Sequence, residues 1–135
     1  MLGIAVEKYQ HHSNLKNVIL DTEAILDCLQ RKISPLTTYI YNTDATKVNI
    51  ERLFEKYLPG NDNELSPEDS LIIYLSGHFE YLAGRKFFVP SDGKDNSSSM
   101  ISFDFFEKFF SRYKSKHILL IFNHYEIDDP MGFVR

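Results

Sequence analysis

Short apolar runs alternate along this chain with longer stretches whose apolar side chains recur at helical spacing. The runs of strand length are Leu2–Val6, Leu36–Tyr41, Ser70–Leu75 and Ile118–Phe122. The stretches of helical spacing are Lys16–Lys32, Thr46–Leu58 and Phe103–Tyr113. The run Ser70–Leu75 is almost continuously apolar, which is typical of a strand covered on both faces in a parallel sheet. We expect Ile118–Phe122 to be buried as well. The alternation predicts an α/β fold.

A small hairpin is predicted after the third strand, because Phe79–Leu82 and Lys86–Val89 flank a turn at Ala83–Arg85. The predicted order is strand, helix, strand, helix, strand, hairpin, helix and strand. Parallel strands in this order need right-handed helical crossovers, so the elements predict a layered α/β sandwich.

Polar residues follow the predicted strands at the ends where parallel sheets carry their chemistry. These segments are Glu7–Tyr9, Asn42–Asp44, Ser76–His78 and Asn123–Glu126. We expect the third strand to end at Ser76–His78. Since functional side chains collect beyond the carboxyl ends of parallel strands, the pattern nominates His78 and Asn123–Glu126 as the candidate site.

Composition and charge narrow the classes of function. With 135 residues, of which 43% are hydrophobic, the chain is expected to form a single domain over residues 1–135. The net charge is −4 and lysine and arginine are not clustered, so neither nucleic acid nor a membrane surface is an expected partner. Cys28 is the only cysteine, so we expect no internal disulfide and a cytoplasmic location. Neither a signal peptide nor a membrane span is predicted.

The sequence lacks the glycine-rich phosphate loops and the common hydrolase, zinc-protease and redox motifs. The missing patterns are GxGxxG, GxxxxGK[ST], GxSxG, HExxH and CxxC. His78, Glu80, His124 and Glu126 do not have the histidine spacing of a metal site. We therefore expect no cofactor and no metal.

Several short motifs occur in an order that resembles a known family. They are Gly3–Tyr9, Leu15–Asn17, Asp21 with Ala24–Ile25, Tyr74–His78, Pro90–Asp92 and Ile118–Asn123. Together they resemble the caspase-like superfamily (peptidase C14), which includes metacaspases and bacterial orthocaspases. The resemblance implies a caspase-like three-layer α/β/α sandwich with a mostly parallel four-stranded sheet and a small β-hairpin. It also implies cysteine endopeptidase chemistry, in which His78 matches the catalytic histidine.

The chain departs from this family pattern at the nucleophile. Tyr125 stands at the cysteine position, and Asn123 stands at the position of the aspartate that binds a basic substrate side chain. Phe79 replaces the glycine after the histidine. A phenol with a pKa near 10 is mostly protonated at pH 7 and does not replace a thiolate. The resemblance therefore implies a catalytically inactive pseudo-peptidase with His78 as a vestigial general base. Such a domain would act as a regulatory or protein-interaction module, in bacterial signalling or defence.

Two other interpretations remain open. In the first, the chain is an active caspase-like endopeptidase that uses His78 with a nucleophile supplied from outside this chain. In the second, it is a non-enzymatic, flavodoxin-like ligand-binding module, although Glu7 stands alone where such modules carry an acidic cluster. His78 is also open to a purely structural role.

Four further expectations concern packing and partners. Ile118–Phe122 lies at the edge of the expected sheet. We therefore expect either that the chain is a fragment of a longer protein or that this strand pairs with a protein partner or with a second copy in a homodimer. Cys28 is expected to pack on the apolar face of the first helix. His11 and His12 are expected to be exposed in a polar loop. The phenylalanine stripe over Phe105–Phe110 is expected to belong to the core.

Overall fold

Each predicted strand and helix has a counterpart in the fold. The computed structural model describes residues 1–33 and 36–126. The strands are β1 (Leu2–Ala5), β2 (Thr38–Tyr41), β3 (Ser70–Leu82), β4 (Arg85–Phe88), β5 (Ile101–Ser102) and β6 (His117–Glu126). The helices are α1 (Val18–Ile33), α2 (Lys47–Glu55) and α3 (Phe103–Arg112), with short 3₁₀ turns η1 (Asn42–Asp44) and η2 (Ser97–Ser99). The prediction of an α/β fold is confirmed.

The strands of the described part form one mixed, six-stranded sheet. The order is β2-β1-β3-β4-β5, and β6 also pairs with β3. The pairs β1–β2, β1–β3 and β3–β6 are parallel, whereas β3–β4 and β4–β5 are antiparallel. We expected the third strand to end at Ser76–His78, and this was wrong. β3 continues through these residues into the hairpin, so the parallel strands and the hairpin share one sheet.

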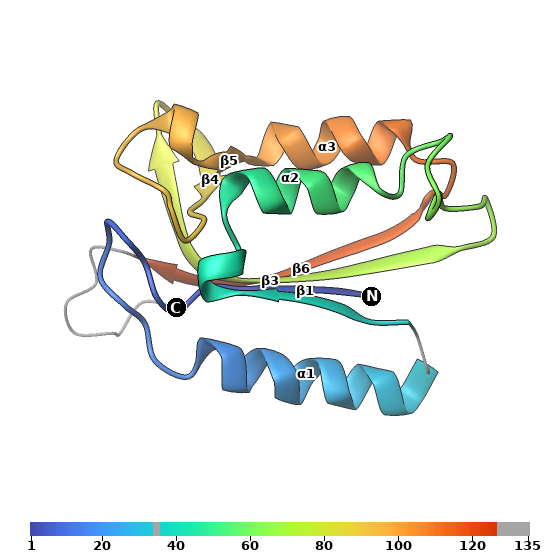
Figure 1. Cartoon of the computed structure of the whole chain (residues 1–135), viewed down its shortest axis with the longest axis horizontal. Helices are drawn as coiled ribbons and strands as arrows, with labels where there is room; N and C mark the ends of the chain where they lie inside the picture. Colours follow the sequence, from blue (N-terminus) through green and yellow to red (C-terminus); the bar gives the residue numbers. More distant parts are fainter. Residues whose placement is uncertain (34–35, 127–135) are drawn as a thin grey trace.

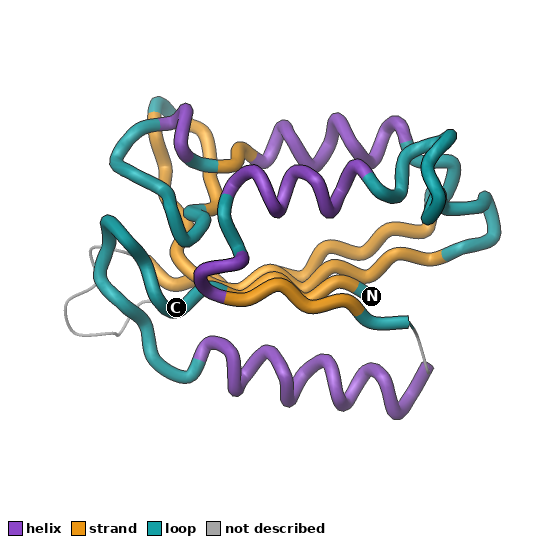
Figure 2. Tube along the Cα trace, viewed as in Figure 1, coloured by secondary structure: helices purple, strands orange, loops and turns teal. Residues whose placement is uncertain are grey.

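The helices lie on both faces of the sheet (Figures 1 and 2). α1 covers one face, and α2 and α3 lie side by side over the other. The larger core lies under α2 and α3 and includes Phe54, Phe106 and Ile73, all at most 1% exposed. A smaller cluster of Met1, Leu26 and Tyr74 lies under α1. No described helix has the length and apolar character needed to cross a membrane.

Local capping explains where α2 and α3 begin. The Thr46 side chain accepts a hydrogen bond from the backbone N–H of Asn49, and Asp92 accepts one from that of Lys47. Ser102 caps α3 in the same way. These caps satisfy N–H groups that have no partner inside the helix. The phenylalanine stripe of α3 is core, as expected, because Phe106 and Phe109 are buried.

The expectation for Cys28 was wrong, since its side chain is exposed. α1 instead contacts the sheet through Val18, Thr22 and Leu26, which are its buried residues. Successive residues turn by about 100° around a helix, so Cys28 lies roughly 200° from Leu26. The apolar positions of α1 form more than one stripe, and only one of them faces the sheet.

The strand β6 is much less covered than its apolar sequence predicted. None of residues 118–125 is buried, and the side chains of Leu119 and Phe122 are 52% and 43% exposed. Within the described residues β6 pairs only with β3, so one of its edges is open. The prediction of a buried strand was wrong, whereas its place at the sheet edge agrees with expectation.

Candidate functional site

The backbone around His78 is fixed by a contact between Gly77 and Tyr9. The Tyr9 hydroxyl donates a hydrogen bond to the Val6 carbonyl oxygen (3.1 Å) and accepts one from the His78 backbone N–H (2.8 Å). A Cβ atom on Gly77 would lie 2.6 Å from the Tyr9 hydroxyl oxygen, and the φ angle of Gly77 is +152°. Only glycine therefore fits this position without strain. These two hydrogen bonds of the Tyr9 hydroxyl connect the loop after β1 to the middle of β3.

The His78 imidazole is buried and oriented by a backbone carbonyl. The residue is 2% exposed, and its Nε2 atom lies 2.8 Å from the Ser13 carbonyl oxygen. A carbonyl can only accept, so Nε2 carries the proton and Nδ1 keeps its lone pair. Nδ1 is buried and has no regular hydrogen bond among the described residues, although the backbone of Tyr125 lies close enough to the ring to raise its pKa. The Ser13 carbonyl thus fixes the orientation of the ring and the tautomer of its neutral form.

The electrostatic surroundings favour this neutral form. Burial lowers the pKa of His78, and the nearby His12 adds to the lowering. The backbone groups of Ser13 and Tyr125 act in the opposite direction but do not cancel the effect of burial. Because the ordinary histidine pKa is about 6.5, His78 is neutral at pH 7.

Tyr125 and Asn123 are placed beside His78 by the register of two parallel strands. His78 pairs with Tyr125 across the β3–β6 ladder, and Ser76 pairs with Asn123. Paired residues in a ladder point to the same face of the sheet. The Asn123 side-chain amide donates to the Tyr125 hydroxyl oxygen at 3.2 Å. The three site residues nominated from the sequence therefore lie together at one place in the sheet.

Phe79 does not belong to this group, contrary to the interpretation from the sequence. Its ring is 2% exposed and packs against the rings of Phe88, Phe103 and Phe122, with centroids 5.2–5.7 Å apart. His124 contacts Phe79 on the same side, at 5.3 Å. Neighbouring strand residues point to opposite faces, so the Phe79 ring is core and leaves the space around the His78 ring unchanged.

The sequence missed His12, whose side chain is only 4% exposed. The expectation of an exposed His12 was wrong, whereas His11 is exposed as expected. The loop after β1 folds back because the Gln10 N–H donates to the Ser91 carbonyl oxygen. His12 then lies 6.5 Å from His78 between ring centroids, with its Nδ1 atom 3.6 Å from an Asp95 carboxylate oxygen. No sequence motif marks this position, since the fold of the loop alone brings it there.

The chemical groups of this site are an imidazole, an amide and a phenol. The single cysteine of the sequence, Cys28, is exposed on α1 and supplies no thiol here. Among the described residues, no group of three or more histidine, cysteine, aspartate or glutamate side chains is arranged to hold a metal ion. The arrangement can accept a proton at the His78 Nδ1 atom, but it presents no strong nucleophile.

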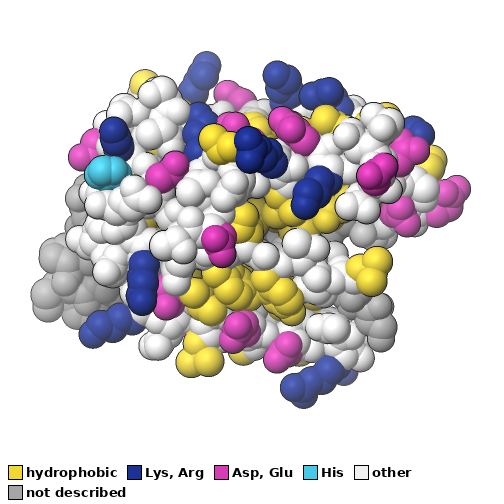
Figure 3. All heavy atoms as spheres, viewed as in Figure 1, with side chains coloured by type: hydrophobic (Ala, Val, Ile, Leu, Met, Phe, Trp, Pro, Cys, Tyr) yellow, Lys and Arg dark blue, Asp and Glu magenta, His cyan; other side chains and the backbone are white. Residues whose placement is uncertain are grey.

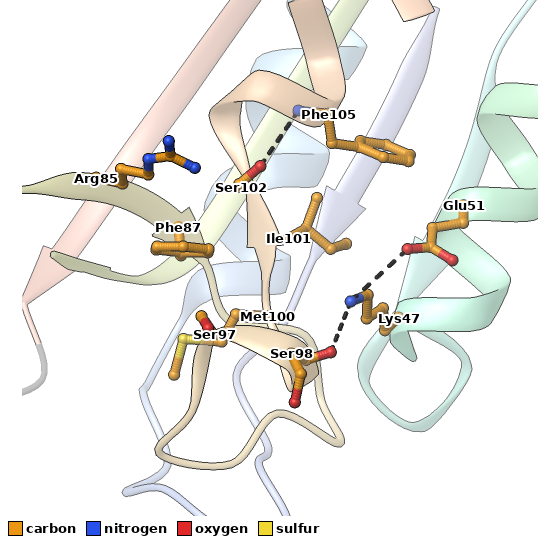
Figure 4. Close-up of a pocket in the computed structure, with 10 residues that line it drawn as sticks. All are labelled: Lys47, Glu51, Arg85, Phe87, Ser97, Ser98, Met100, Ile101, Ser102 and Phe105. Atoms are coloured by element: carbon orange, nitrogen blue, oxygen red, sulfur yellow. Dashed lines mark hydrogen bonds and ion pairs between the residues drawn. The ribbon is translucent and has the colours of Figure 1, made fainter. Parts of the chain in front are cut away.

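A separate pocket of about 290 Å³ lies between α2, β4 and β5 (Figure 4). Its charged groups are engaged within the chain. The Lys47 ammonium donates to the Ser98 carbonyl oxygen at 2.7 Å and lies 3.9 Å from Glu51. The Arg85 guanidinium pairs with Asp104 at 3.5 Å. None of the site residues nominated from the sequence lines this pocket.

Comparisons with known proteins place the chain in no family. No protein-family model matches it, and a search of curated proteins found no significant match. Fold and site together define an α/β protein with a buried, oriented histidine paired with a tyrosine on the adjacent parallel strand.

Replacing Tyr9 with phenylalanine is expected to destabilise the fold by about 1–3 kcal/mol, because the buried His78 N–H loses its acceptor. Urea denaturation of Tyr9→Phe beside Tyr81→Phe measures this. Tyr81 is 63% exposed, so its variant is expected to stay within about 0.5 kcal/mol of the parent. Equal stability of the two variants would contradict the role given to the Tyr9 hydroxyl.

The lowered pKa of His78 makes stability depend on pH. Between the folded pKa and about 6.5, the unfolded chain binds the proton more readily, so stability falls as the pH is lowered through this window. We expect the urea midpoint to fall less between pH 7 and roughly 5 in His78→Gln than in the parent. His11→Gln is the matched control because His11 is exposed, and its pH profile should equal that of the parent. An unchanged profile in His78→Gln would refute the assignment.

Proposed function

We propose that this chain is a caspase-like domain that has lost its peptidase chemistry and acts as a regulatory or protein-interaction module. In this interpretation, β2, β1, β3 and β6 correspond to the mostly parallel four-stranded sheet of a three-layer sandwich. The hairpin and β5 are then an extension of that sheet. The observation that carries the proposal is the pairing of His78 with Tyr125 on adjacent parallel strands.

His78 is suited to the role of a peptidase general base, whereas Tyr125 is poorly suited to the role of the nucleophile. The Ser13 carbonyl orients the neutral imidazole with its proton on Nε2, so that Nδ1 carries the lone pair that a general base uses. A tyrosine at position 125 is a weak nucleophile at pH 7, and its hydroxyl is already hydrogen-bonded to Asn123. The site thus keeps the base and lacks the nucleophile, as in a disabled enzyme.

The open edge of β6 supports an interaction role. Unpaired strand edges readily add a further strand, above all where exposed apolar side chains flank them. Leu119 and Phe122 are such side chains. Residues 118–125 contain no lysine, arginine, aspartate or glutamate, so two copies of the strand can meet without like-charge repulsion. The occupant that fits this edge best is a second copy of the chain.

Cleavage of a mixed fluorogenic peptide library tests the loss of chemistry. We expect the natural chain to cleave none of the peptides and Tyr125→Cys to cleave some of them. Adding His78→Ala to Tyr125→Cys is expected to abolish this cleavage. Cleavage by the natural chain that depends on His78 would contradict the proposal and favour an active endopeptidase with a nucleophile from another source. A Tyr125→Cys variant that is folded but cleaves no peptide would count against an inherited peptidase site.

Sedimentation equilibrium tests the pairing of β6. We expect a dimer at tens of micromolar that Leu119→Lys dissociates, since a charge on the edge opposes strand addition. Leu20→Lys is the matched control, because Leu20 is 65% exposed but lies on α1. A monomeric natural chain, or equal effects of the two variants, would overturn the assignment of the dimer to β6.

A further inference from the structure

Two tyrosines and two carboxylates line a small pocket between the strand β2 and the helix α1. Tyr39 and Tyr41 are two residues apart on β2 and therefore share one face of the strand. Glu23 and Asp27 are four residues apart on α1 and share one face of the helix. These four residues line a pocket of about 300 Å³. β2 lies at the end of the sheet order, so the pocket lies at its margin.

The two tyrosine rings form an angled wall of this pocket. Their centroids are 5.6 Å apart and their planes meet at 55°, so they do not stack flat on each other. Tyr39 lies over Gly3, where an added Cβ would be 3.3 Å from its ring, and 42% of its surface stays exposed. The Tyr39 ring is therefore supported on one side by Gly3 of β1, and its exposed part leaves aromatic surface available for a ligand.

The charge of the pocket is uncompensated within the described chain. Glu23 and Asp27 form no ion pair there, and no lysine, arginine or histidine lines the pocket. Like charges one helical turn apart destabilise a helix.

Burial raises the pKa of Tyr41, and Glu23, Tyr39 and Asp27 raise it further. The Tyr41 hydroxyl is buried and has no hydrogen-bond partner among the described residues. A like-charge pair and a buried hydroxyl without a hydrogen bond both destabilise the fold locally, and such features are typical of binding sites.

The surface around the pocket also combines apolar and acidic side chains. Figure 3 shows hydrophobic side chains gathered between the sheet and α1, with acidic side chains beside them. A pocket elsewhere on α1 differs in charge, since Arg31 and Lys32 line it together with Cys28.

We propose that this pocket binds an organic cation through an ammonium or guanidinium group. The negative faces of the Tyr39 and Tyr41 rings attract a cation, and the Glu23 and Asp27 carboxylates neutralise its charge. A volume of about 300 Å³ lies at the lower end for ligand pockets and suits a single cationic head group. The proposal is independent of the peptidase resemblance, because none of the residues around His78 takes part.

Titration followed by amide NMR shifts tests the proposal with defined probes. Choline and 3,3-dimethyl-1-butanol have nearly the same shape and differ in charge. We expect choline to shift the amides of Tyr39, Tyr41, Glu23 and Asp27, and the neutral alcohol to leave them in place. N-acetyl-lysine methylamide and N-acetyl-arginine methylamide distinguish the source of the cation. Tighter binding of either one than of choline assigns the pocket to a basic peptide side chain.

Variants separate the contributions of ring and charge. Tyr39→Leu is expected to weaken choline binding at least about fivefold, whereas Tyr39→Phe keeps the ring and should stay within about twofold. Asp27→Asn and Glu23→Gln are expected to weaken binding and to reduce its salt dependence. Glu107→Gln on α3 is the matched control. Equal shifts from the neutral alcohol, no shift at saturating choline, or equal binding by Tyr39→Leu and the parent would overturn the proposal.

Discussion

Replacing Phe79 with glycine is expected to destabilise the fold by about 3–5 kcal/mol and to restore no activity. Glycine is the residue that the caspase-like resemblance implies at this position, so the substitution is a natural attempt to repair the site. The Phe79 ring is buried among Phe88, Phe103 and Phe122, and its loss leaves a cavity in that aromatic cluster. The Lys86 ammonium also lies 5.2 Å from the ring centroid.

Urea denaturation of Phe79→Gly beside Tyr81→Gly measures the effect. Tyr81 lies two residues further along β3 and is 63% exposed, so its variant carries the backbone cost of glycine without a core cavity. We expect that control to lose about 1 kcal/mol. If Phe79→Gly proved as stable as the control, the Phe79 ring would not belong to the core.

Gly77→Ala is expected to destabilise the fold by about 2–4 kcal/mol, the second largest effect. The new Cβ would approach the Tyr9 hydroxyl oxygen to 2.6 Å and the Val6 carbonyl oxygen to 3.2 Å. The Tyr9 hydroxyl must then move away, and the His78 N–H loses its acceptor. The strained φ of +152° adds to this cost.

Gly84→Ala is the matched control for Gly77→Ala. Gly84 also has a positive φ, +76°, but a Cβ there would meet nothing within 4 Å. We expect it to lose about 1 kcal/mol from backbone strain alone. The cost of Gly77→Ala should fall in a Tyr9→Phe background, because the clashing oxygen is gone. Equal costs for the two glycines would contradict the close contact between Gly77 and Tyr9.

Much of the fold was predictable because local signals agreed with the tertiary structure. Thr46 and Ser102 cap the helices they precede, and the hairpin turn lies at Ala83 and Gly84 as the sequence predicted. Two features could not be predicted. α1 has several apolar stripes, and the pattern did not show which one faces the sheet. β3 continues through Gly77 because the partner on one of its edges changes from parallel β1 to antiparallel β4, a tertiary event without a local signal.

The candidate site was predictable where it depends on strand register. His78, Asn123 and Tyr125 follow apolar strand segments, and adjacent parallel strands bring such positions together. The Ser13 carbonyl that orients His78 was not predictable, because every residue carries a carbonyl. His12 was missed for a related reason, since the fold of its loop depends on a backbone hydrogen bond from Gln10 to Ser91.

The most direct test of the central claim is the pH dependence of thiol alkylation at position 125. Iodoacetamide would be reacted with Tyr125→Cys in a Cys28→Ser background, because Cys28 is exposed and would react as well. The measurement is then repeated with His78→Ala. If His78 and position 125 form an inherited catalytic pair, the thiol pKa lies below its ordinary value of about 8.5 and rises when His78 is removed. Identical pH–rate profiles with and without His78 would contradict the account.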